Sequence, residues 1–240
     1  MKAIILASGI GKRLTPLIEE LPKTLIEING VALLDRMIKS LTENNVSEII
    51  ITTGYLEEKI KEFVKNKYPD LKATYVKNPI FDKTNYIYSL WLTKDIAKDD
   101  DIILLHGDMF FEPRLMKRVV DSEKSCALIK NSPQVPEKDF KARISGGLIK
   151  EIGVNVFGQD ARFCAPIYKL LKDDFKTWIN KIEEFINENN TNVYAEDALN
   201  KITDQLKFYP LYYNDEFAME IDDFEDLEKA KKILKDFTCN

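Results

Sequence analysis

Four short, almost continuously apolar segments alternate with amphipathic patterns through the first half of the chain, and this alternation limits the fold more than any other feature. The apolar segments are 2–7 (KAIILA), 48–53 (EIIITT), 73–78 (ATYVKN) and 101–108 (DIILLHGD), and the helical patterns lie at 31–43, 56–66 and 86–97. Strands that are apolar on both faces need helices on both sides, as in repeated βαβ units. We therefore predict an α/β fold with a mostly parallel sheet flanked by helices.

The middle of the chain, from about residue 125 to 170, has a different pattern. Four strand-like segments, CALIK, KARIS, LIKEIGVNVF and ARFCAPIY, follow one another here, with Gly146 and Gly147 among them. Short strands joined by turns predict a small antiparallel lobe inserted into the fold. Helices at about 170–187 and 196–205, strands at 207–213 and 217–222, and a helix at 222–237 complete the chain. Because no linker or repeat interrupts the pattern, we expect a single domain over residues 1–240.

The charge and the cysteines exclude several classes of protein. The net charge of −5 argues against a nucleic-acid partner, because proteins of that kind normally have a basic excess. Cys126, Cys164 and Cys239 form no CxxC pair, so we expect free thiols and neither a zinc site nor a disulfide framework. No apolar run reaches the roughly 20 residues of a membrane span, and the N-terminal run is too short for a signal peptide. We expect a cytoplasmic protein with no membrane partner, either a monomer or a homodimer.

A loop rich in glycine and basic residues follows the first apolar segment directly. It contains Gly9, Gly11, Lys12 and Arg13, and Lys23 lies further along the same stretch. The backbone N–H groups of such a loop, together with its basic side chains, suit a polyphosphate. The loop is not of the Walker type, because Leu6 takes the place of the first glycine and Arg13 that of the hydroxyl residue. A dinucleotide fingerprint is excluded as well, because residue 14 is leucine.

Three carboxylates are candidates for binding a divalent metal ion. Asp108 ends the segment 101–108, where a parallel strand delivers side chains to the ligand crevice. Glu220 and Asp222 lie two residues apart in FAMEIDD and so share one face of the expected strand. Mg²⁺ that is bound to phosphates takes one or two protein carboxylates. An aspartate at a strand end can equally be a helix cap, and we interpret Asp223 as the cap of the last helix.

The whole segment KAIILASGIGKRLTPLIEELPKTLIEING closely resembles the LAxGxGxRLxP…PKxL signature of nucleotidyltransferases that make nucleoside-diphosphate sugars and alcohols. The resemblance implies a Rossmann-like sheet with the active site above the carboxyl ends of the strands. It implies that the triphosphate of the nucleotide is held by Leu6, Ala7, Ser8, Gly9, Gly11 and Lys12, together with the catalytic residues Arg13 and Lys23. It also implies Mg²⁺ as the cofactor, bound by Asp108 and Asp222 with Glu220 as a third ligand.

The segment NPIFDKTNYIYSLWLTKD resembles one branch of this family, the phosphocholine cytidylyltransferases of bacterial surface decoration. On this resemblance we expect CTP as the donor, transfer of CMP with release of pyrophosphate, and a role in capsule or surface-polysaccharide decoration. Asn85, which also suits a helix cap, and Ser89 are then expected to bind the nucleotide. We place His106 in the same set, either in direct contact with the substrate or packed behind it.

The acceptor is expected to be a small phosphorylated or phosphonate compound. Aromatic side chains in the inserted lobe suit a trimethylammonium group but equally suit a core: Phe140, Phe157, Phe163 and Tyr168. Arg143 and Arg162 suit a carboxylate or phosphate, unless they pair with nearby aspartates at the surface. Tyr194 and Glu196 would receive an ammonium group or simply start a helix. The arginines favour a zwitterion, such as phosphoglutamine or aminoethylphosphonate, over phosphocholine.

Two other functions remain open at the level of the sequence. A sugar-1-phosphate nucleotidyltransferase, which makes a nucleoside-diphosphate sugar, shares the glycine loop. A non-catalytic nucleotide-binding regulator would share the fold, but the joint presence of Arg13, Lys23, Asp108 and Asp222 argues against it.

Overall fold

The computed structural model describes residues 1–238, with side chains described through Lys235. Its strands are β1 (Lys2–Leu6), β2 (Glu27–Ile28), β3 (Val31–Ala32), β4 (Glu48–Thr53), β5 (Lys72–Lys77), β6 (Ile102–His106), β7 (Met109–Phe111), β8 (Cys126–Lys130), β9 (Lys141–Ser145), β10 (Leu148–Gly153), β11 (Ala161–Leu170), β12 (Tyr209–Tyr213) and β13 (Ala218–Glu220). Its helices are α1 (Leu33–Thr42), α2 (Glu57–Lys67), α3 (Tyr86–Trp91), α4 (Lys94–Ala97), α5 (Pro113–Asp121), α6 (Lys172–Asn187), α7 (Ala195–Leu199) and α8 (Phe224–Thr238). Two 3-10 turns, η1 (Lys12–Leu14) and η2 (Lys23–Leu25), lie in the opening loop.

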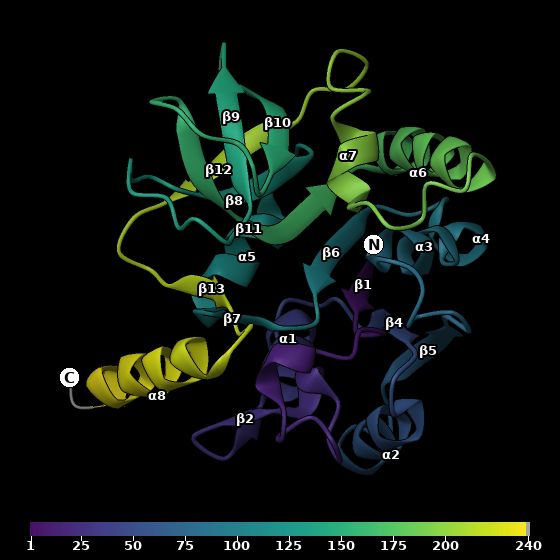
Figure 1. The fold of residues 1–240 in the computed structure, drawn as a ribbon, viewed down its shortest axis with the longest axis vertical. Helices are drawn as coiled ribbons and strands as arrows, with labels where there is room; N and C mark the ends of the chain where they lie inside the picture. The colour runs from purple at the N-terminus through teal and green to yellow at the C-terminus, as the bar shows by residue number, and fades with distance from the viewer. Residues whose placement is uncertain (239–240) are drawn as a thin grey trace.

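The four strands of the first half form the parallel part of a nine-stranded sheet, whose main path is β10-β9-β11-β6-β1-β4-β5 (Figure 1). Ile4 on β1 lies in register with Ile50 on β4 and Leu104 on β6. Ile4 packs into a core under α3 and α6, whereas its neighbour Ile5 packs into the opposite core under α1, α2 and α5. Each fully buried side chain of this size stabilises the fold by about 1.5–3 kcal/mol. The predicted α/β fold, with helices on both faces of a Rossmann-like sheet, is confirmed.

The strands of the middle segment extend this sheet directly. The long strand β11 pairs antiparallel with β6, so that Tyr168 lies opposite Leu104, and its first residues pair with β9. β8 pairs with β11 on one side and with β12 on the other. β9 and β10 form a hairpin whose turn contains Gly146 and Gly147, both with positive φ. The predicted antiparallel lobe therefore shares β11 with the main sheet. That residues 1–240 form a single domain stays a prediction.

Some elements end earlier than the sequence pattern predicts. The helix expected at 86–97 is divided into α3 and α4 at Thr93, a buried residue whose hydroxyl donates to the carbonyl of Leu90. This bond between side chain and backbone competes with the regular helix pattern. The helix expected at 196–205 ends at Leu199, and the strand expected at 148–157 ends at Gly153. Asp223 caps α8 as predicted, because its Oδ1 accepts the backbone N–H of Asp226 at 3.0 Å.

Two further expectations concern the cysteines and the membrane. Cys126 and Cys164 are buried free thiols, and Cys239 lies outside the described residues. Within residues 1–238, no helix combines the length and the apolar composition that crossing a membrane requires.

Candidate active site

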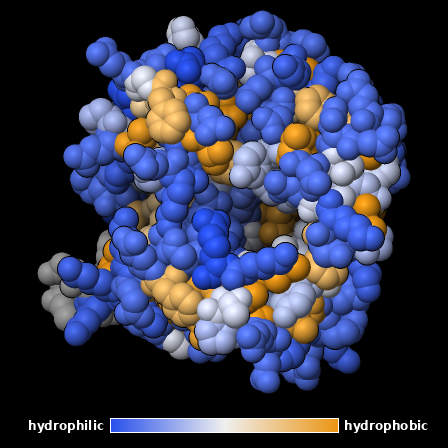
Figure 2. Space-filling model, viewed as in Figure 1, coloured by the Kyte–Doolittle hydropathy of each residue, from blue (hydrophilic) through white to orange (hydrophobic). Residues whose placement is uncertain are grey.

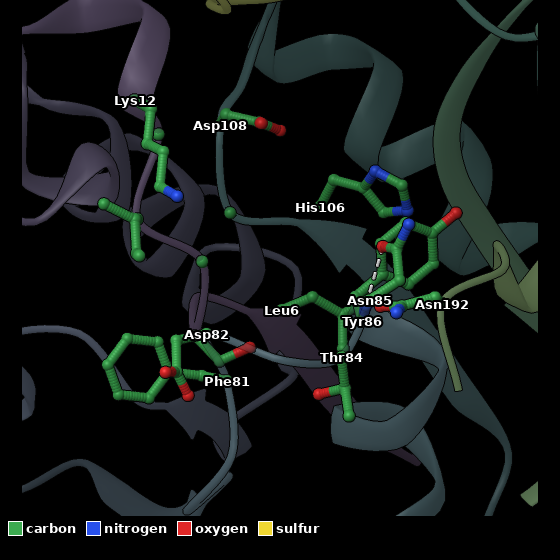
Figure 3. A pocket seen from close by; sticks show the side chains of 15 residues that line it. Leu6, Lys12, Phe81, Asp82, Thr84, Asn85, Tyr86, His106, Asp108 and Asn192 are labelled. Atoms are coloured by element: carbon green, nitrogen blue, oxygen red, sulfur yellow. Dashed lines mark hydrogen bonds between the residues drawn. The ribbon is translucent and has the colours of Figure 1, made fainter. Parts of the chain in front are cut away.

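A cavity of about 390 Å³ opens where β1 and β6 end, beside the glycine loop. Figure 2 shows one face of the molecule with a hollow near its middle, surrounded mostly by hydrophilic side chains. The cavity is lined by residues of the loop, of the segment before α3 and of the end of β6: Leu6, Ser8, Gly9, Ile10, Gly11, Lys12, Phe81, Asp82, Thr84, Asn85, Tyr86, His106, Gly107 and Asp108, with Asn192 (Figure 3). A smaller cavity of about 130 Å³ shares part of this lining and adds Ala7, Lys23 and Thr24. Most of the predicted nucleotide-binding residues therefore surround one space.

The two stretches of the opening loop are in close contact at Gly11 and Lys23. Gly11 has a φ of +77°, in the left-handed region that favours glycine. A Cβ atom at this position would lie only 3.0 Å from Cδ of Lys23. The glycine therefore lets the loop turn directly against the side chain of Lys23.

Lys23 lies between two of the predicted metal-binding carboxylates. Its Nζ donates to Oδ2 of Asp108 and, at 2.7 Å, to Oδ1 of Asp222, while Nη2 of Arg13 lies 2.9 Å from Oδ2 of Asp222. Burial alone would lower the pKa of Lys23, but the charges of Asp108 and Asp222 outweigh it and raise this pKa above its usual value. Burial would raise the pKa of Asp108, and the charge of Lys23 lowers it instead. Lys23, Asp108 and Asp222 thus form one partly buried ionic cluster, which the exposed side chain of Arg13 joins from outside.

A second group of possible ligands lies at the other side of Asp108. The ligand atoms of His106, Asp108 and Glu220 all lie within 4.8 Å of one another. Nδ1 of His106 is 3.3 Å from Oε1 of Glu220, and burial raises the pKa of Glu220 to about 7. The buried Oδ1 of Asp108 and Nε2 of His106 have no hydrogen-bond partner among the described residues. The three predicted metal ligands therefore all lie near Asp108. Glu220 lies close to it together with His106, whereas Asp222 is linked to it by the shared hydrogen-bond donor Lys23.

Ser89 occupies a different place from the one predicted. It is fully buried and does not line the cavity. Its Oγ lies 2.7 Å from Oγ of Ser8 and accepts from Nδ2 of Asn78 at 2.9 Å. This geometry holds Ser8 in the cavity wall and places Ser89 behind it, and binding of a nucleotide by Ser89 stays a prediction. Asn85 caps α3, because its Oδ1 accepts the N–H of Tyr86. It also lines the cavity, and its contact with a nucleotide stays a prediction.

Four rings pack in sequence at the His106 end of the cavity, and we call them the aromatic cluster: Tyr86, His106, Phe140 and Tyr194. The ring centroids of Tyr86 and His106 are 4.6 Å apart, and those of Phe140 and Tyr194 are 5.0 Å apart. Glu196, 1% exposed, lies behind these rings and accepts hydrogen bonds from the hydroxyls of Tyr86 and, at 2.9 Å, Tyr168. Figure 3 shows Tyr86 and His106 at this end and Lys12 and Asp108 away from it. Tyr194 is the N-cap residue of α7, so the helix starts here as the sequence also suggested.

The two arginines predicted to bind the acceptor have other partners. Nε of Arg143 donates to Glu151 at 3.0 Å and its Nη1 to Asp160 at 3.1 Å. Nη1 of Arg162 donates to the backbone carbonyls of Gln159 and Ala161. Neither arginine lines the cavity. Arg143 is thus paired with carboxylates and Arg162 with backbone carbonyls of the lobe, and a contact of either arginine with the acceptor stays a prediction.

The sequence interpretation missed part of the cavity wall. Three of the missed residues lie directly before Asn85 in the segment 78–95, which resembles the cytidylyltransferases: Phe81, Asp82 and Thr84. Their place in this segment could have identified them. Asn192 lies far away in the sequence, and only the folded chain brings it to α3.

Parallel strands that present a glycine loop, basic side chains and carboxylates at one edge are typical of an enzyme that binds a nucleotide. The family model described as "Nucleotidyl transferase" matches residues 2–140, and the chain belongs to this family. It is a nucleotidyltransferase.

Several of the individual proteins to which the chain is similar are cytidylyltransferases. It is similar to CTP:phosphoglutamine cytidylyltransferase of Campylobacter jejuni, with 25% identity over 92% of this chain and 93% of that protein. It is 31% identical to CMP-5'-(3-aminopropyl)phosphonate synthase of Streptomyces rubellomurinus over 57% of this chain, which spans only 22% of that longer protein. The solved CTP:phosphocholine cytidylyltransferase of Streptococcus pneumoniae has the same fold, with a TM-score of 0.82 and 24% identity over 97% of this chain and 98% of that one.

Proposed function

We propose that the chain is a cytidylyltransferase that transfers CMP from CTP to a small acceptor bearing a phosphate or phosphonate and an ammonium group. The choice of CTP follows the resemblance of residues 78–95 to phosphocholine cytidylyltransferases and the names of the relatives. The observation that carries the choice of acceptor is the aromatic cluster, two of whose rings, Tyr86 and His106, line the end of the cavity beside buried Glu196 and Glu220.

An ammonium group fits this end of the cavity better than a carboxylate does. The faces of aromatic rings attract a cation by about 0.5–2 kcal/mol each. Glu196 receives its closest hydrogen bonds from two neutral hydroxyls, those of Tyr86 and Tyr168, which leave its negative charge to attract a cation. A carboxylate on the acceptor would approach the charge of Glu196, and no arginine among the described residues lines this cavity to balance the two. Phosphocholine and aminoethylphosphonate are therefore the preferred candidates, and phosphoglutamine, which also carries an ammonium group, is the third.

The reaction needs charge neutralisation and alignment more than a base. An oxygen of the acceptor phosphate attacks the α-phosphorus of CTP, a P–O bond forms there, and the bond to the bridging oxygen breaks, so that pyrophosphate leaves with that electron pair. The acceptor phosphate already carries about −1.5 to −2 charge at pH 7, so no side chain has to remove a proton. The loop N–H groups would bind the triphosphate, and Lys23 and Arg13 would neutralise the charge of the departing pyrophosphate.

The residues of the site fit a magnesium ion. The buried Oδ1 of Asp108 lacks a hydrogen-bond partner among the described residues and is suited to accept a cation. Asp108 and Asp222 offer carboxylate oxygens, the ligands that Mg²⁺ prefers, whereas the imidazole of His106 suits softer metals better. Asp108 and Asp222 would hold Mg²⁺, with Glu220 as the third carboxylate. The ion would supply positive charge to the phosphates, and Lys23 would then donate to a phosphate in place of one aspartate.

A panel assay of pyrophosphate release tests the proposal. CTP, UTP, GTP and dTTP are each combined with phosphocholine, aminoethylphosphonate, phosphoglutamine and glucose 1-phosphate, with Mg²⁺ or with EDTA. We expect release with CTP and the ammonium-bearing acceptors, and none with EDTA. Release only with a sugar phosphate would establish the alternative, a sugar-1-phosphate nucleotidyltransferase. Binding of nucleotide without any release would indicate a regulator. A role in capsule or surface-polysaccharide decoration is part of the same proposal.

A further inference from the structure

The carboxylate of Asp226, in the first turn of α8, holds the backbone at Asp222. Its Oδ2 accepts the backbone N–H of Asp222 at 3.0 Å and that of Asp223 at 3.3 Å. The same oxygen receives Nζ of Lys138 at 2.8 Å. Asp226 is only 8% exposed, so these bonds are largely protected from water.

The backbone on the other side of Asp222 is held by the second predicted ligand. The N–H of Ile221 donates to the carbonyl oxygen of Asp108 at 3.0 Å. Asp222 is thus fixed through the backbone on both sides, and its carboxylate is directed between Lys23 and Arg13. A side chain whose backbone is fixed in this way is preorganised to bind a ligand.

Lys138 connects Asp226 to the part of the chain that contributes to the aromatic cluster. Its Nζ bridges Asp226 and, at 2.7 Å, Oδ2 of Asp223. Lys138 lies in the loop between β8 and β9, two residues before Phe140 of the aromatic cluster. One short stretch of chain therefore contacts both the helix that follows Asp222 and the ring of Tyr194.

We propose that Asp226, together with Lys138, is a positioning residue that holds Asp222 in place for the metal ion. Neither residue lines the cavity that would receive the nucleotide, so both act through Asp222. The inference rests on the proposed role of Asp222 as a metal ligand. Partners that orient a metal ligand typically change metal affinity by about 10- to 100-fold when they are removed.

Direct binding of Mn²⁺, followed by electron paramagnetic resonance of the free ion, provides a readout besides activity. We expect Asp226→Ala to weaken Mn²⁺ binding by about 10-fold or more. Asp226→Asn keeps an oxygen that accepts the N–H of Asp222 and should recover most of the affinity. Asp223→Ala is the matched control, because it removes the helix cap and one contact of Lys138 but keeps the bond from Asp222 to Asp226. It should lower the melting temperature and leave Mn²⁺ binding unchanged.

The Asp222→Asn variant distinguishes a failure of the proposed metal site from a failure of the positioning role of Asp226. If Asp222→Asn leaves Mn²⁺ binding unchanged, the proposed metal site is wrong and the inference falls with it. If Asp222→Asn weakens binding but Asp226→Ala does not, or if Asp223→Ala weakens it as much, only the positioning role is wrong. Lys138→Met changes an exposed loop side chain and should weaken Mn²⁺ binding in the same direction. It decides the question should Asp226→Ala fail to fold, since unchanged binding in Lys138→Met would then overturn the inference.

Discussion

The ammonium group of Lys23 lies 2.7 Å from Oδ1 of Asp222, and Asp108 accepts a second hydrogen bond from the same nitrogen. The lysine thus balances the charge of two carboxylates that would otherwise repel each other in a buried site. A divalent cation that binds both carboxylates would compete with the lysine for them. The lysine is then free to move to a phosphate, so the arrival of nucleotide and metal favours its release.

Lys23→Ala is therefore expected to change turnover and metal binding in opposite directions. Turnover should fall by about 10²- to 10³-fold, as is usual when one preorganised charge donor is lost. In the absence of CTP, Mn²⁺ should bind the variant more tightly than the wild type, because the competing ammonium group is gone. Steady-state kinetics and Mn²⁺ titration measure the two effects. Unchanged kinetics would remove Lys23 from the mechanism.

Asp108→Asn and Asp222→Asn should each abolish Mg²⁺-dependent activity while leaving the circular dichroism spectrum unchanged. The two carboxylates are proposed to bind one cation, so the double variant should be little worse than either single variant. The cycle of turnover numbers measures this coupling. Effects that simply multiply would show that the two residues act independently.

Gly11→Ala should impair both stability and activity. The left-handed conformation costs an L-residue about 1–2 kcal/mol, and the new Cβ would press against the side chain of Lys23. Gly30→Ala is a matched control, because Gly30 has a φ of +74° and a Cβ atom there would meet none of the described residues within 4 Å, apart from its chain neighbours. Urea denaturation should show a similar loss of stability in both variants, and turnover should fall only in Gly11→Ala. Equal turnover in the two variants would contradict the importance of the contact with Lys23.

Acceptor recognition should depend on the ring of Tyr86 and not on Arg143. Tyr86→Leu should raise the KM for phosphocholine by about 2- to 30-fold, which corresponds to the loss of one cation–π contact. Tyr86→Phe keeps the ring and should stay closer to the wild type. Arg143→Ala should change the KM of no acceptor, because this side chain pairs with Glu151 and Asp160. A selective loss of phosphoglutamine turnover in Arg143→Ala would restore the role that the sequence first suggested for this arginine.

Tyr168 should contribute to stability in a way that is lost at alkaline pH. Burial, and then the charge of Glu196, raise the pKa of Tyr168 well above the value of about 10 that tyrosine has in an unfolded chain. Above pH 10 the unfolded chain therefore binds fewer protons than the native one, and stability falls as the pH rises. Tyr168→Phe should be less stable at pH 8, since it loses a hydrogen bond to a charged group worth about 1.5–3 kcal/mol. Urea midpoints at pH 8 and pH 11 should show this difference shrinking. Exposed Tyr212, changed to Phe, serves as the control.

The sheet and the glycine loop could be predicted from the sequence because both depend on local order along the chain. The apolar segments mark the strands through their two-sided burial, and Gly11 and Lys23 belong to one short signature. The contacts of Asp226 could not be predicted in this way, since an acidic residue in the first turn of a helix is ordinary. Only tertiary structure brings Lys138 and Asp222 to it.

The pairing of Arg143 has a physical origin that the sequence does contain. Gly146 and Gly147 form the turn of the β9–β10 hairpin, and this turn places Arg143 opposite Glu151 on the neighbouring strand. Directly opposed residues of antiparallel strands interact, so Arg143 and Glu151 pair within the hairpin itself and need no ligand to do so. The scarcity of arginine was a weaker guide than the register of the hairpin.

Strand β11 also limits how the enzyme can admit its substrates. Its first three residues are in register with β9 and its last four with β6, and its pairing with β8 shifts register between Ala165 and Tyr168. One strand thus joins the lobe to the end of β6 at the cavity. A hinge motion of the lobe against the parallel strands would have to break these hydrogen bonds. We therefore expect the connecting segments to move when the cavity opens or closes, such as residues 131–140 and the loop that contains Lys12. Structures with and without nucleotide should superimpose along the strands of the central sheet and differ in these segments alone.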